Sequence, residues 1–281
     1  MIKLSVIIPT CNRQHSLRRS VNSVLDQNID NLEVIVVDDY KEDQTSDITN
    51  LFADISCVRV VKSWSHSPSG ARNIGVSNAK GEYITFLDDD DIYLPGRLKN
   101  MLSYFETSAT TLSFVSSGRF FETDDFKTIF GDDSQIYGEI TLSDVLEDNG
   151  IDIGFLMRRD FFNKLNGFDE TFSSLEDWDI ILRSLLVNNG YKLQRLDYVV
   201  NAEIDRNRVS FSQEKSRNKL ADKYLFTFGS KWYYENKLRG LHELGLFDWR
   251  IFLKSLRYSH SLLPIKIVIK HLLKAKKNDA N

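Results

Sequence analysis

The chain has 281 residues and a formal net charge of −4, with 42% hydrophobic and 27% charged residues. This composition is typical of a globular protein with a sizeable core, and the length fits one large α/β domain or one domain with an appendage. Two cysteines do not make a disulfide framework, so we expect reduced thiols and a cytoplasmic protein. We find no signal-peptide pattern and no apolar run of roughly 18 residues, so we do not expect an integral membrane protein.

Strands and helices alternate in the first third of the chain. Short apolar runs predict strands, and apolar residues at helical spacing predict the helices between them. The predicted strands are residues 4–8, 33–37, 57–61 and 83–87, and the predicted helices are residues 17–25 and 71–79. This order favours a mostly parallel sheet with helices on both faces, in which ligands bind at the carboxyl ends of the strands.

The remaining chain is predicted to be mainly helical. We predict a strand at residues 152–157, a helix at 158–165, and a helix from 177 to 186 that Asn189 and Gly190 terminate. Further helices are predicted at 216–245, with breaks at Gly240 and Gly245, then at 250–258 and 264–277. The expected division is a domain of residues 1–212, with halves of about 1–110 and 111–212, and a helical extension of residues 213–281.

Four consecutive aspartates, residues 88–91, follow the last predicted strand of the sheet. Adjacent carboxylates at the end of a buried strand are costly unless a cation lies among them, and Mg²⁺ or Mn²⁺ prefers such oxygen ligands. The alternative is a solvated acidic loop. An EF-hand is excluded because, counting from Asp88, Tyr93 occupies the position of the required Gly and Lys99 that of the required Glu.

Five segments resemble the sequential motifs of glycosyltransferase family 2: SVIIPTCNR, VIVVDD, SGARNIG, YITFLDDDDIYLPGRL and GFDETFSSLEDWDIILR. The resemblance runs from about residue 4 to about residue 210. It implies the GT-A fold, an α/β architecture with a mostly parallel central sheet, followed here by a C-terminal helical extension. It also implies an inverting enzyme that transfers a sugar from a nucleotide diphosphate, with a UDP-sugar as the expected donor. The expected acceptor is a hydroxyl of a saccharide or lipid-linked oligosaccharide in cell-surface polysaccharide synthesis.

The resemblance implies a donor site made by the first four motifs. Asp39 is expected to hold the uracil, although an aspartate at this position also suits a turn. Arg72 offers a planar fork of donors suited to phosphate, and the alternative is an ion pair with the acidic cluster. The alternative for this segment is an ordinary helix start with Ser69 as its N-cap. The residues expected to contact the donor are Pro9, Thr10, Asn12, Arg13, Asp38, Asp39, Gly70, Arg72, Asn73, Asp88 and Asp89.

The resemblance also implies a metal site for Mn²⁺ or Mg²⁺. Asp90 is the expected direct ligand, and Asp88 is expected to contact the ribose or the metal's water shell. Many members of the family have a His after the acceptor motif, where this chain has Asp205. Asp205 is therefore a candidate second ligand. The alternative is a surface residue, with Arg206 and Arg208 facing the pyrophosphate.

On the acceptor side, the resemblance places Asp177 as the catalytic base that takes the proton of the attacking hydroxyl. Glu176 and Trp178 are the expected acceptor-side neighbours. The alternative for the two carboxylates is a capping role at a helix N-terminus, where the dipole favours negative charge. A non-catalytic nucleotide-sugar- or carbohydrate-binding module would need no base. A sugar-phosphate nucleotidyltransferase would need a Gly-rich, Lys-bearing loop after the first strand, which is not found here.

The C-terminal segment is strongly basic. Residues 250–277 contain eight Lys or Arg and no Asp or Glu, so the rest of the chain carries about twelve excess negative charges (−4 minus +8). Apolar and basic stripes in residues 264–277 favour contact with an anionic membrane, at the inner face of the plasma membrane, and the alternative is an ordinary packed helix. No nucleic-acid partner is expected. The donor sugar, the acceptor, the linkage and the oligomeric state do not follow from the sequence.

Overall fold

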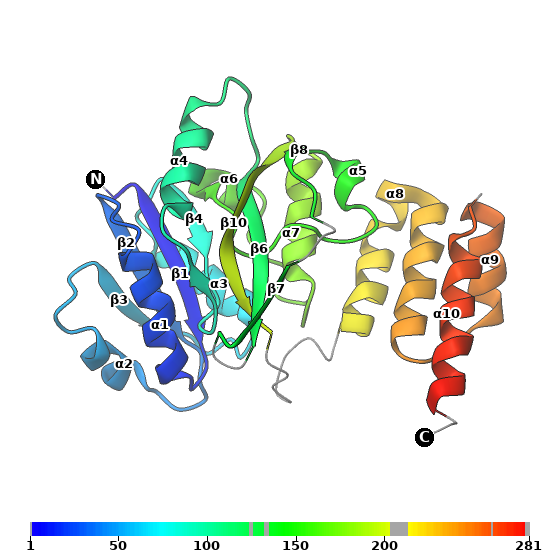
Figure 1. Ribbon diagram of the computed structural model, residues 1–281, viewed down its shortest axis with the longest axis horizontal. Helices are drawn as coiled ribbons and strands as arrows, with labels where there is room; N and C mark the ends of the chain where they lie inside the picture. Colours follow the sequence, from blue (N-terminus) through cyan, green and yellow to red (C-terminus); the bar gives the residue numbers. More distant parts are fainter. Residues whose placement is uncertain (1, 124–125, 132–134, 203–212, 260, 279–281) are drawn as a thin grey trace. The chain divides into compact units, whose positions relative to one another are not determined.

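The computed structural model describes residues 2–123, 126–131, 135–202, 213–259 and 261–278 (Figure 1). The chain forms two compact units, Met1–Glu170 with Glu176–Asp205, and Thr171–Leu175 with Arg206–Asn281. Residues 203–212 lie outside the described residues, so the expected boundary at 212/213 stays a prediction. Within the described ranges, no helix is long and apolar enough to cross a membrane.

The first unit contains the predicted parallel sheet, in the order β3-β2-β1-β4-β9. The first four strands are parallel, and β9 pairs antiparallel with β4 at the edge. Nearly every residue of β1 and β2 is buried, as expected for strands covered on both faces. The strands are β1 (Leu4–Thr10), β2 (Leu32–Asp38), β3 (Val58–Lys62), β4 (Tyr83–Phe86) and β9 (Met157–Arg158).

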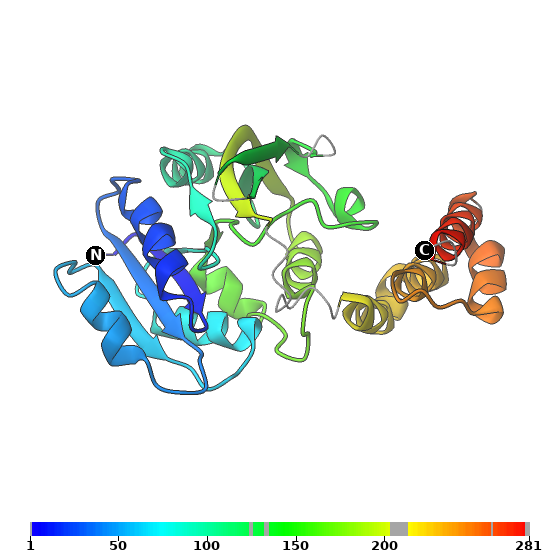
Figure 2. The same ribbon diagram turned by 60° about the horizontal axis from the view of Figure 1, so that its bottom comes forward.

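Helices connect these strands and cover both faces of the sheet. Because parallel crossovers are right-handed, α1 (Gln14–Leu25) and α2 (Thr45–Leu51) lie on one face and α3 (Pro68–Asn78) lies on the other (Figure 2). The N-cap of α3 is Ser67, whose side chain accepts a hydrogen bond from Gly70 N, so the alternative with Ser69 as N-cap is wrong. Pro68 occupies the first turn, where its missing N–H costs nothing.

A second sheet, in the order β5-β10-β6-β7 with β8 also on β10, was not predicted. Its central strands, β10 and β6, run parallel, and the other pairs are antiparallel. The predicted strand at 152–157 is wrong except at its end, because residues 152–156 form a loop around the buried Arg97. The strands are β5 (Ile92–Tyr93), β6 (Val115–Thr123), β7 (Thr128–Gly131), β8 (Gly138–Ile140) and β10 (Gly190–Asn201). The helices of this part are α4 (Arg97–Thr107), α5 (Leu142–Val145), α6 (Arg159–Lys164) and α7 (Glu176–Leu185).

The second unit consists of helices, as predicted. They are α8 (Gln213–Glu243), α9 (Trp249–Ser259) and α10 (Leu263–Asn278). The break in α8 is at Gly229, with φ of 78°, and not at the predicted Gly240, which stays helical. Gly229 has open space around it, whereas Gly240 packs closely against Asn218, which lies in α8 before the break at Gly229.

Candidate active site

The acidic segment forms a tight turn directly after β4. Asp91 N donates to Asp88 O at 3.1 Å, which closes the turn over residues 88–91. Helix α1 holds the turn from one side, because Ser20 Oγ donates to Asp91 O at 2.6 Å and an Arg19 nitrogen donates to Asp90 O at 3.1 Å. The backbone of this segment is therefore tied to the fold at several points, and the choice between a cation site and a solvated acidic loop stays open.

The carboxylates of the turn differ in their surroundings. Asp89 is buried and accepts a hydrogen bond from Thr10 Oγ1 at 2.7 Å. Burial, and then the charge of Asp90, raise the pKa of Asp89 to about 6 against the lowering effect of the Thr10 hydrogen bond. Asp90 is partly exposed and pairs with Arg13 at 2.9 Å. Thr10, Arg13, Asp89 and Asp90 thus meet at the carboxyl ends of β1 and β4, as the motifs predicted.

Arg72 connects the donor half with the acceptor half of the first unit. It is 5% exposed, and its two terminal nitrogens pair with Asp88 at 2.6 Å and with Glu176 at 2.7 Å. These two carboxylates raise the pKa of the guanidinium despite its burial. The structure therefore favours the ion-pair alternative for Arg72. The same contact brings the N-terminus of α7, which carries Asp177, to the acidic turn.

Asp38 and Asp39 are buried at the end of β2. Asp38 accepts hydrogen bonds from Tyr40 N and Gln44 N and pairs with Lys62 at 3.1 Å. Asp39 accepts two hydroxyl and two backbone N–H hydrogen bonds from residues 63–67, which include the N-cap of α3. Both carboxylates thus shape the loops around the site, and the predicted contact of Asp39 with uracil stays a prediction.

The other predicted donor residues lie around the same edge of the sheet. Asn73 exchanges hydrogen bonds with the backbone of Phe168 and donates to Glu170, so its amide holds the loop before α7. Gly70 is required because a Cβ there would lie 2.4 Å from Ser65 Cβ. Pro9 lies in β1, and Asn12 has a left-handed φ of 57° in the loop that follows. Their contacts with a donor stay predictions.

The predicted base, Asp177, is half-buried in the first turn of α7. Trp178 N donates to its Oδ1 at 2.7 Å, and Asn149 Nδ2 donates to its Oδ2 at 3.1 Å. Burial, and then the charge of Glu176, raise the pKa of Asp177 to about 7. A carboxylate with such a pKa is suited to accept a proton near neutral pH. Asn149 lies outside α7, so a tertiary contact also holds the Asp177 side chain, and the role of Asp177 as the base stays a prediction.

Two further predictions have different outcomes. Trp178 is fully buried, and its indole N–H donates to Val145 O at 2.8 Å. The Trp178 ring therefore packs in the core and anchors α7. It has no exposed face to contact a saccharide, so its predicted acceptor-side role is wrong. Asp205, the candidate second metal ligand, lies outside the described residues, as do Arg206 and Arg208.

The acidic turn can be compared with the needs of a hard divalent cation. In the part of the chain that the structure describes, no three His, Cys, Asp or Glu side chains are grouped to hold a metal ion. Asp88 and Asp90 nevertheless have the right chemistry, and the Asp88 side chain is 38% exposed. Mg²⁺ and Mn²⁺ are usually held by one or two carboxylates together with substrate phosphates. The two residues fit a cation that arrives with a diphosphate.

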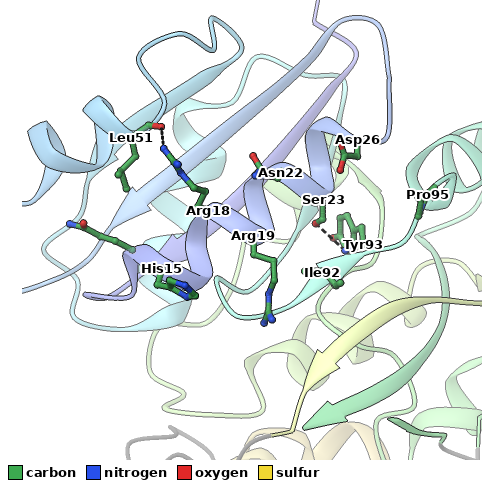
Figure 3. Close-up of a pocket in the computed structure, with 11 residues that line it drawn as sticks. His15, Arg18, Arg19, Asn22, Ser23, Asp26, Leu51, Ile92, Tyr93 and Pro95 are labelled. Carbon is green, nitrogen blue, oxygen red and sulfur yellow. Dashed lines mark hydrogen bonds between the residues drawn. The ribbon is translucent and has the colours of Figure 1, made fainter. Parts of the chain in front are cut away.

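A pocket of about 890 Å³ lies along α1 (Figure 3). One face of α1 lines it, with Leu51, Ile92, Tyr93 and Pro95 opposite. None of the predicted site residues lines this pocket. It meets the acidic turn through Arg19, which donates to Asp90 O, and through Ile92, which directly follows the turn.

Two residues that the sequence analysis missed take part in the site. Asn149 binds the candidate base, and Asp91 is buried beneath the acidic turn. Asn149 lies 28 residues from Asp177, and no motif includes it. The signal for Asp91 was its place in the run of four aspartates, but its burial could not be predicted from that run.

Comparison with known proteins identifies the family of the chain. The sequence pattern described as Glycosyl transferase family 2 matches residues 5–165, which include the first four motifs. The chain is 40% identical over 105 residues to the GalNAc(5)-diNAcBac-PP-undecaprenol β-1,3-glucosyltransferase of Campylobacter jejuni, covering 36% of this chain and 34% of that protein. It is 33% identical over 111 residues to a UDP-Glc:α-D-GlcNAc-diphosphoundecaprenol β-1,3-glucosyltransferase of Escherichia coli, covering 40% and 44%. The chain thus spans less than half the length of these relatives.

Solved structures share the fold. The structure of S. aureus TarS 1–349 in complex with UDP aligns with a TM-score of 0.65 at 20% identity, covering 86% of this chain and 71% of that one. The complex of the same protein with UDP-GlcNAc aligns with a TM-score of 0.65 at 19% identity, covering 86% and 72%. At this identity the likeness confirms the predicted α/β fold of nucleotide-sugar transferases.

Proposed function

Because the chain belongs to glycosyl transferase family 2, we propose that it transfers a sugar from a UDP-sugar to a hydroxyl of a lipid-linked saccharide, with inversion and with help from a divalent cation. The observation that carries this proposal is the Arg72 bridge, which joins Asp88 of the acidic turn to Glu176. The bridge supports the proposal because it joins the turn that carries the cation-suited carboxylates of Asp88 and Asp90 to the helix that carries Asp177, whose pKa is about 7. A binding module needs only the first of these.

The residues divide the work of the reaction between them. Asp90 and Asp88 would hold Mn²⁺ or Mg²⁺, which neutralises the diphosphate as it leaves. Asp177 accepts the proton of the acceptor hydroxyl while that oxygen attacks the anomeric carbon from the face opposite the diphosphate. Asn149 holds the base through its Oδ2, and the hydrogen bond favours the ionised carboxylate that the step requires.

The nature of the substrates is supported by the relatives. Two of them are named for acceptors carried on diphosphoundecaprenol, and one of these names specifies UDP-Glc as donor. The structural neighbour binds UDP and UDP-GlcNAc. A UDP-sugar donor and a lipid-linked acceptor are the substrates that these names support for the present chain.

A lipid-linked acceptor requires the enzyme to reach a membrane surface, and the second unit has side chains suited to it. Large apolar side chains are exposed on α9 and α10, next to exposed basic residues on the same helices. The exposed apolar residues are Trp249, Leu253, Ile265 and Ile269, and the exposed basic residues are Arg250, Lys254, Lys266 and Lys270. Each basic residue near an anionic surface contributes roughly 1 kcal/mol. We therefore expect reversible binding of this unit to the inner face of the plasma membrane.

The donor is tested by the thermal stability of the purified protein against a panel of nucleotide sugars with Mn²⁺, because a ligand that binds only the folded state stabilises it by RT ln(1 + [L]/Kd). UDP-sugars should raise the melting temperature, and EDTA should abolish the rise. Release of UDP in the presence of a diphosphopolyprenol-linked saccharide then measures turnover. If the protein binds the donor but shows no turnover, and Asp177→Asn binds the donor equally well, the protein is a non-catalytic binding module instead.

The membrane contact is tested separately by flotation with anionic and neutral vesicles at low and high salt. Binding should require the anionic lipid and weaken at about 1 M salt, where the Debye length is about 3 Å. A Lys266→Glu/Lys270→Glu variant should float less, and Lys41→Glu, an exposed change in the first unit, should float like wild type. Equal flotation with both vesicle types would contradict the membrane contact and support the alternative of ordinary packed helices.

A further inference from the structure

Asp91, the last residue of the acidic turn, is tied to the fold through every polar group it has. Its backbone N closes the turn by donating to Asp88 O, and its backbone O accepts a hydrogen bond from Ser20 of α1. Its side chain is buried, with 5% exposed. The residue is therefore part of the turn but does not take part in its exposed surface.

The carboxylate of Asp91 reaches across to the second sheet. Its Oδ2 accepts a hydrogen bond from Tyr198 Oη at 2.6 Å, and its Oδ1 accepts one from Asn201 N at 2.9 Å. Both donors belong to the last four residues of β10, and Tyr198 is itself 1% exposed. One buried carboxylate thus joins the end of β10 to the turn that carries Asp88 and Asp90.

The surroundings keep this connection rigid. The guanidinium of Arg97 lies 4.8 Å from the ring centroids of both Tyr93 and Tyr198. Arg97 also donates to Asp197, the neighbour of Tyr198 on β10, at 3.0 Å. The phenol that binds Asp91 is therefore held in place on its other side, and its hydroxyl has little freedom to turn away.

Burying a carboxylate beside three others is unfavourable unless its hydrogen bonds compensate. A leucine has the same branching without a charge, but it is larger and would leave Tyr198 Oη and Asn201 N without their acceptor. The carboxylate gives what a leucine cannot: two directed hydrogen bonds that fix the distance between the turn and β10. The Asp91 carboxylate therefore fixes the position of the turn. It also fixes the positions of Asp88 and Asp90, because these residues belong to the same tight turn.

We infer that Asp91, through Tyr198 and the backbone of Asn201, is a positioning residue that holds the acidic turn in the arrangement that binds the diphosphate of the donor. This inference rests on the proposed function, because only that function makes the diphosphate of the donor, with its cation, the ligand of the acidic turn. Asp91 itself contacts neither the donor nor the cation. It acts through the backbone of the turn, and Tyr198 acts through Asp91.

The test compares variants that differ in hydrogen bonding but little in shape. In Asp91→Asn the amide oxygen accepts from Asn201 N while the amide N–H donates to the Tyr198 hydroxyl, so both hydrogen bonds persist and UDP affinity with Mn²⁺ should stay within about threefold of wild type. In Asp91→Leu both are lost, and the affinity should fall at least tenfold. Tyr198→Phe should lower it by a smaller factor. Tyr191→Phe, on the same strand and stacked on Tyr104 at 4.1 Å, is the matched control and should bind UDP like wild type.

The double variant Asp91→Leu/Tyr198→Phe separates positioning from stability. Replacing both partners by apolar groups removes the unpaired hydroxyl, so part of the lost thermal stability should return. The UDP affinity should not return with it, because the directed hydrogen bonds are still missing. Wild-type affinity in either Asp91→Leu variant, measured well below its melting temperature, would overturn the inference.

Hydrogen exchange gives a second measurement that needs no ligand. Amides of a peptide covering residues 86–93 should exchange at least tenfold faster in Asp91→Leu than in wild type, while a peptide covering β1 should not change. Equal exchange of the turn would also overturn the inference. If the wild-type protein does not bind UDP, the proposed function is wrong, and hydrogen exchange alone decides whether Asp91 positions the turn.

Discussion

The pKa of Asp177 gives a prediction with a definite sign. The ordinary value is 3.8, and the value in the protein is about 7, a rise of about 3 units. A general base must be ionised, so the rate should fall as the pH drops through about 7, approaching tenfold per pH unit. Burial is the largest cause of the rise and the charge of Glu176 is the next. Because Trp178 N–H, Arg72 and Arg119 lower the value, the order of the causes does not give the share of Glu176, which we expect to be about one unit.

The substitution Glu176→Gln isolates this share. The amide oxygen of glutamine still accepts the hydrogen bond from Arg72, so the packing of α7 is kept. Removing the negative charge should lower the pKa of Asp177 by about one unit. The ionised fraction at pH 6 then rises from about 9% to about 50%, so turnover at pH 6 should be about fivefold faster relative to its own maximum. Above pH 8 the two enzymes should have the same fraction of active base.

The assay is the release of UDP at saturating donor, acceptor and Mn²⁺ across pH 5.5 to 9. Glu170→Gln is the matched control, because this exposed glutamate keeps its hydrogen bond from Asn73 when it becomes glutamine. Asp177→Asn should lose about 10² to 10⁴ in kcat, the usual contribution of a general base. An acid limb that does not move in Glu176→Gln, or that moves to higher pH, would refute the assignment of Asp177 as the base.

Three further outcomes are expected. Asp90→Ala should lose UDP binding that depends on Mn²⁺, measured by calorimetry, and equal binding by this variant with Mn²⁺ and with EDTA would contradict its role as ligand. Arg72→Met should lower the free energy of unfolding by about 3 kcal/mol in urea titration, because it leaves Glu176, whose side chain is 12% exposed, without its buried partner; a loss under about 1 kcal/mol would contradict this. Asn149→Ala should shift the acid limb of the rate to higher pH by roughly half to one unit, since a hydrogen bond that favours ionised Asp177 is lost, and a shift to lower pH would count against it.

The sequence by itself determined the four parallel strands of the first sheet and the helices α1 and α3. The strands β1 and β2 are buried on both faces, so they are continuous apolar runs that need no partner to be recognised. Helix α1 buries Leu17, Val21 and Val24, which recur at helical spacing. Because parallel strands end at one edge of the sheet, the polar residues after β1, β2 and β4 had to meet there.

The second sheet could be found only in the tertiary structure. Strand β10 buries Lys192, whose Nζ donates to Gly150 O at 2.7 Å, and Asp197, which pairs with Arg97. Buried charged residues interrupt the apolar pattern by which a strand is predicted. Their burial depends on partners far along the chain, which the local sequence does not show. The predicted strand at 152–157 failed for the same reason, since this segment instead wraps the guanidinium of Arg97.

The contacts that make the site were likewise decided by tertiary structure. The sequence placed Arg72 near carboxylates, but it could not tell phosphate binding from ion pairing, because Glu176 is 104 residues away. Asp91 looked like its three neighbours until its partner Tyr198, 107 residues further on, was known. Short-range patterns fix which residue types stand at the strand ends. The fold decides which of their charges face a ligand and which are neutralised by another part of the chain, because that choice depends on distances in space.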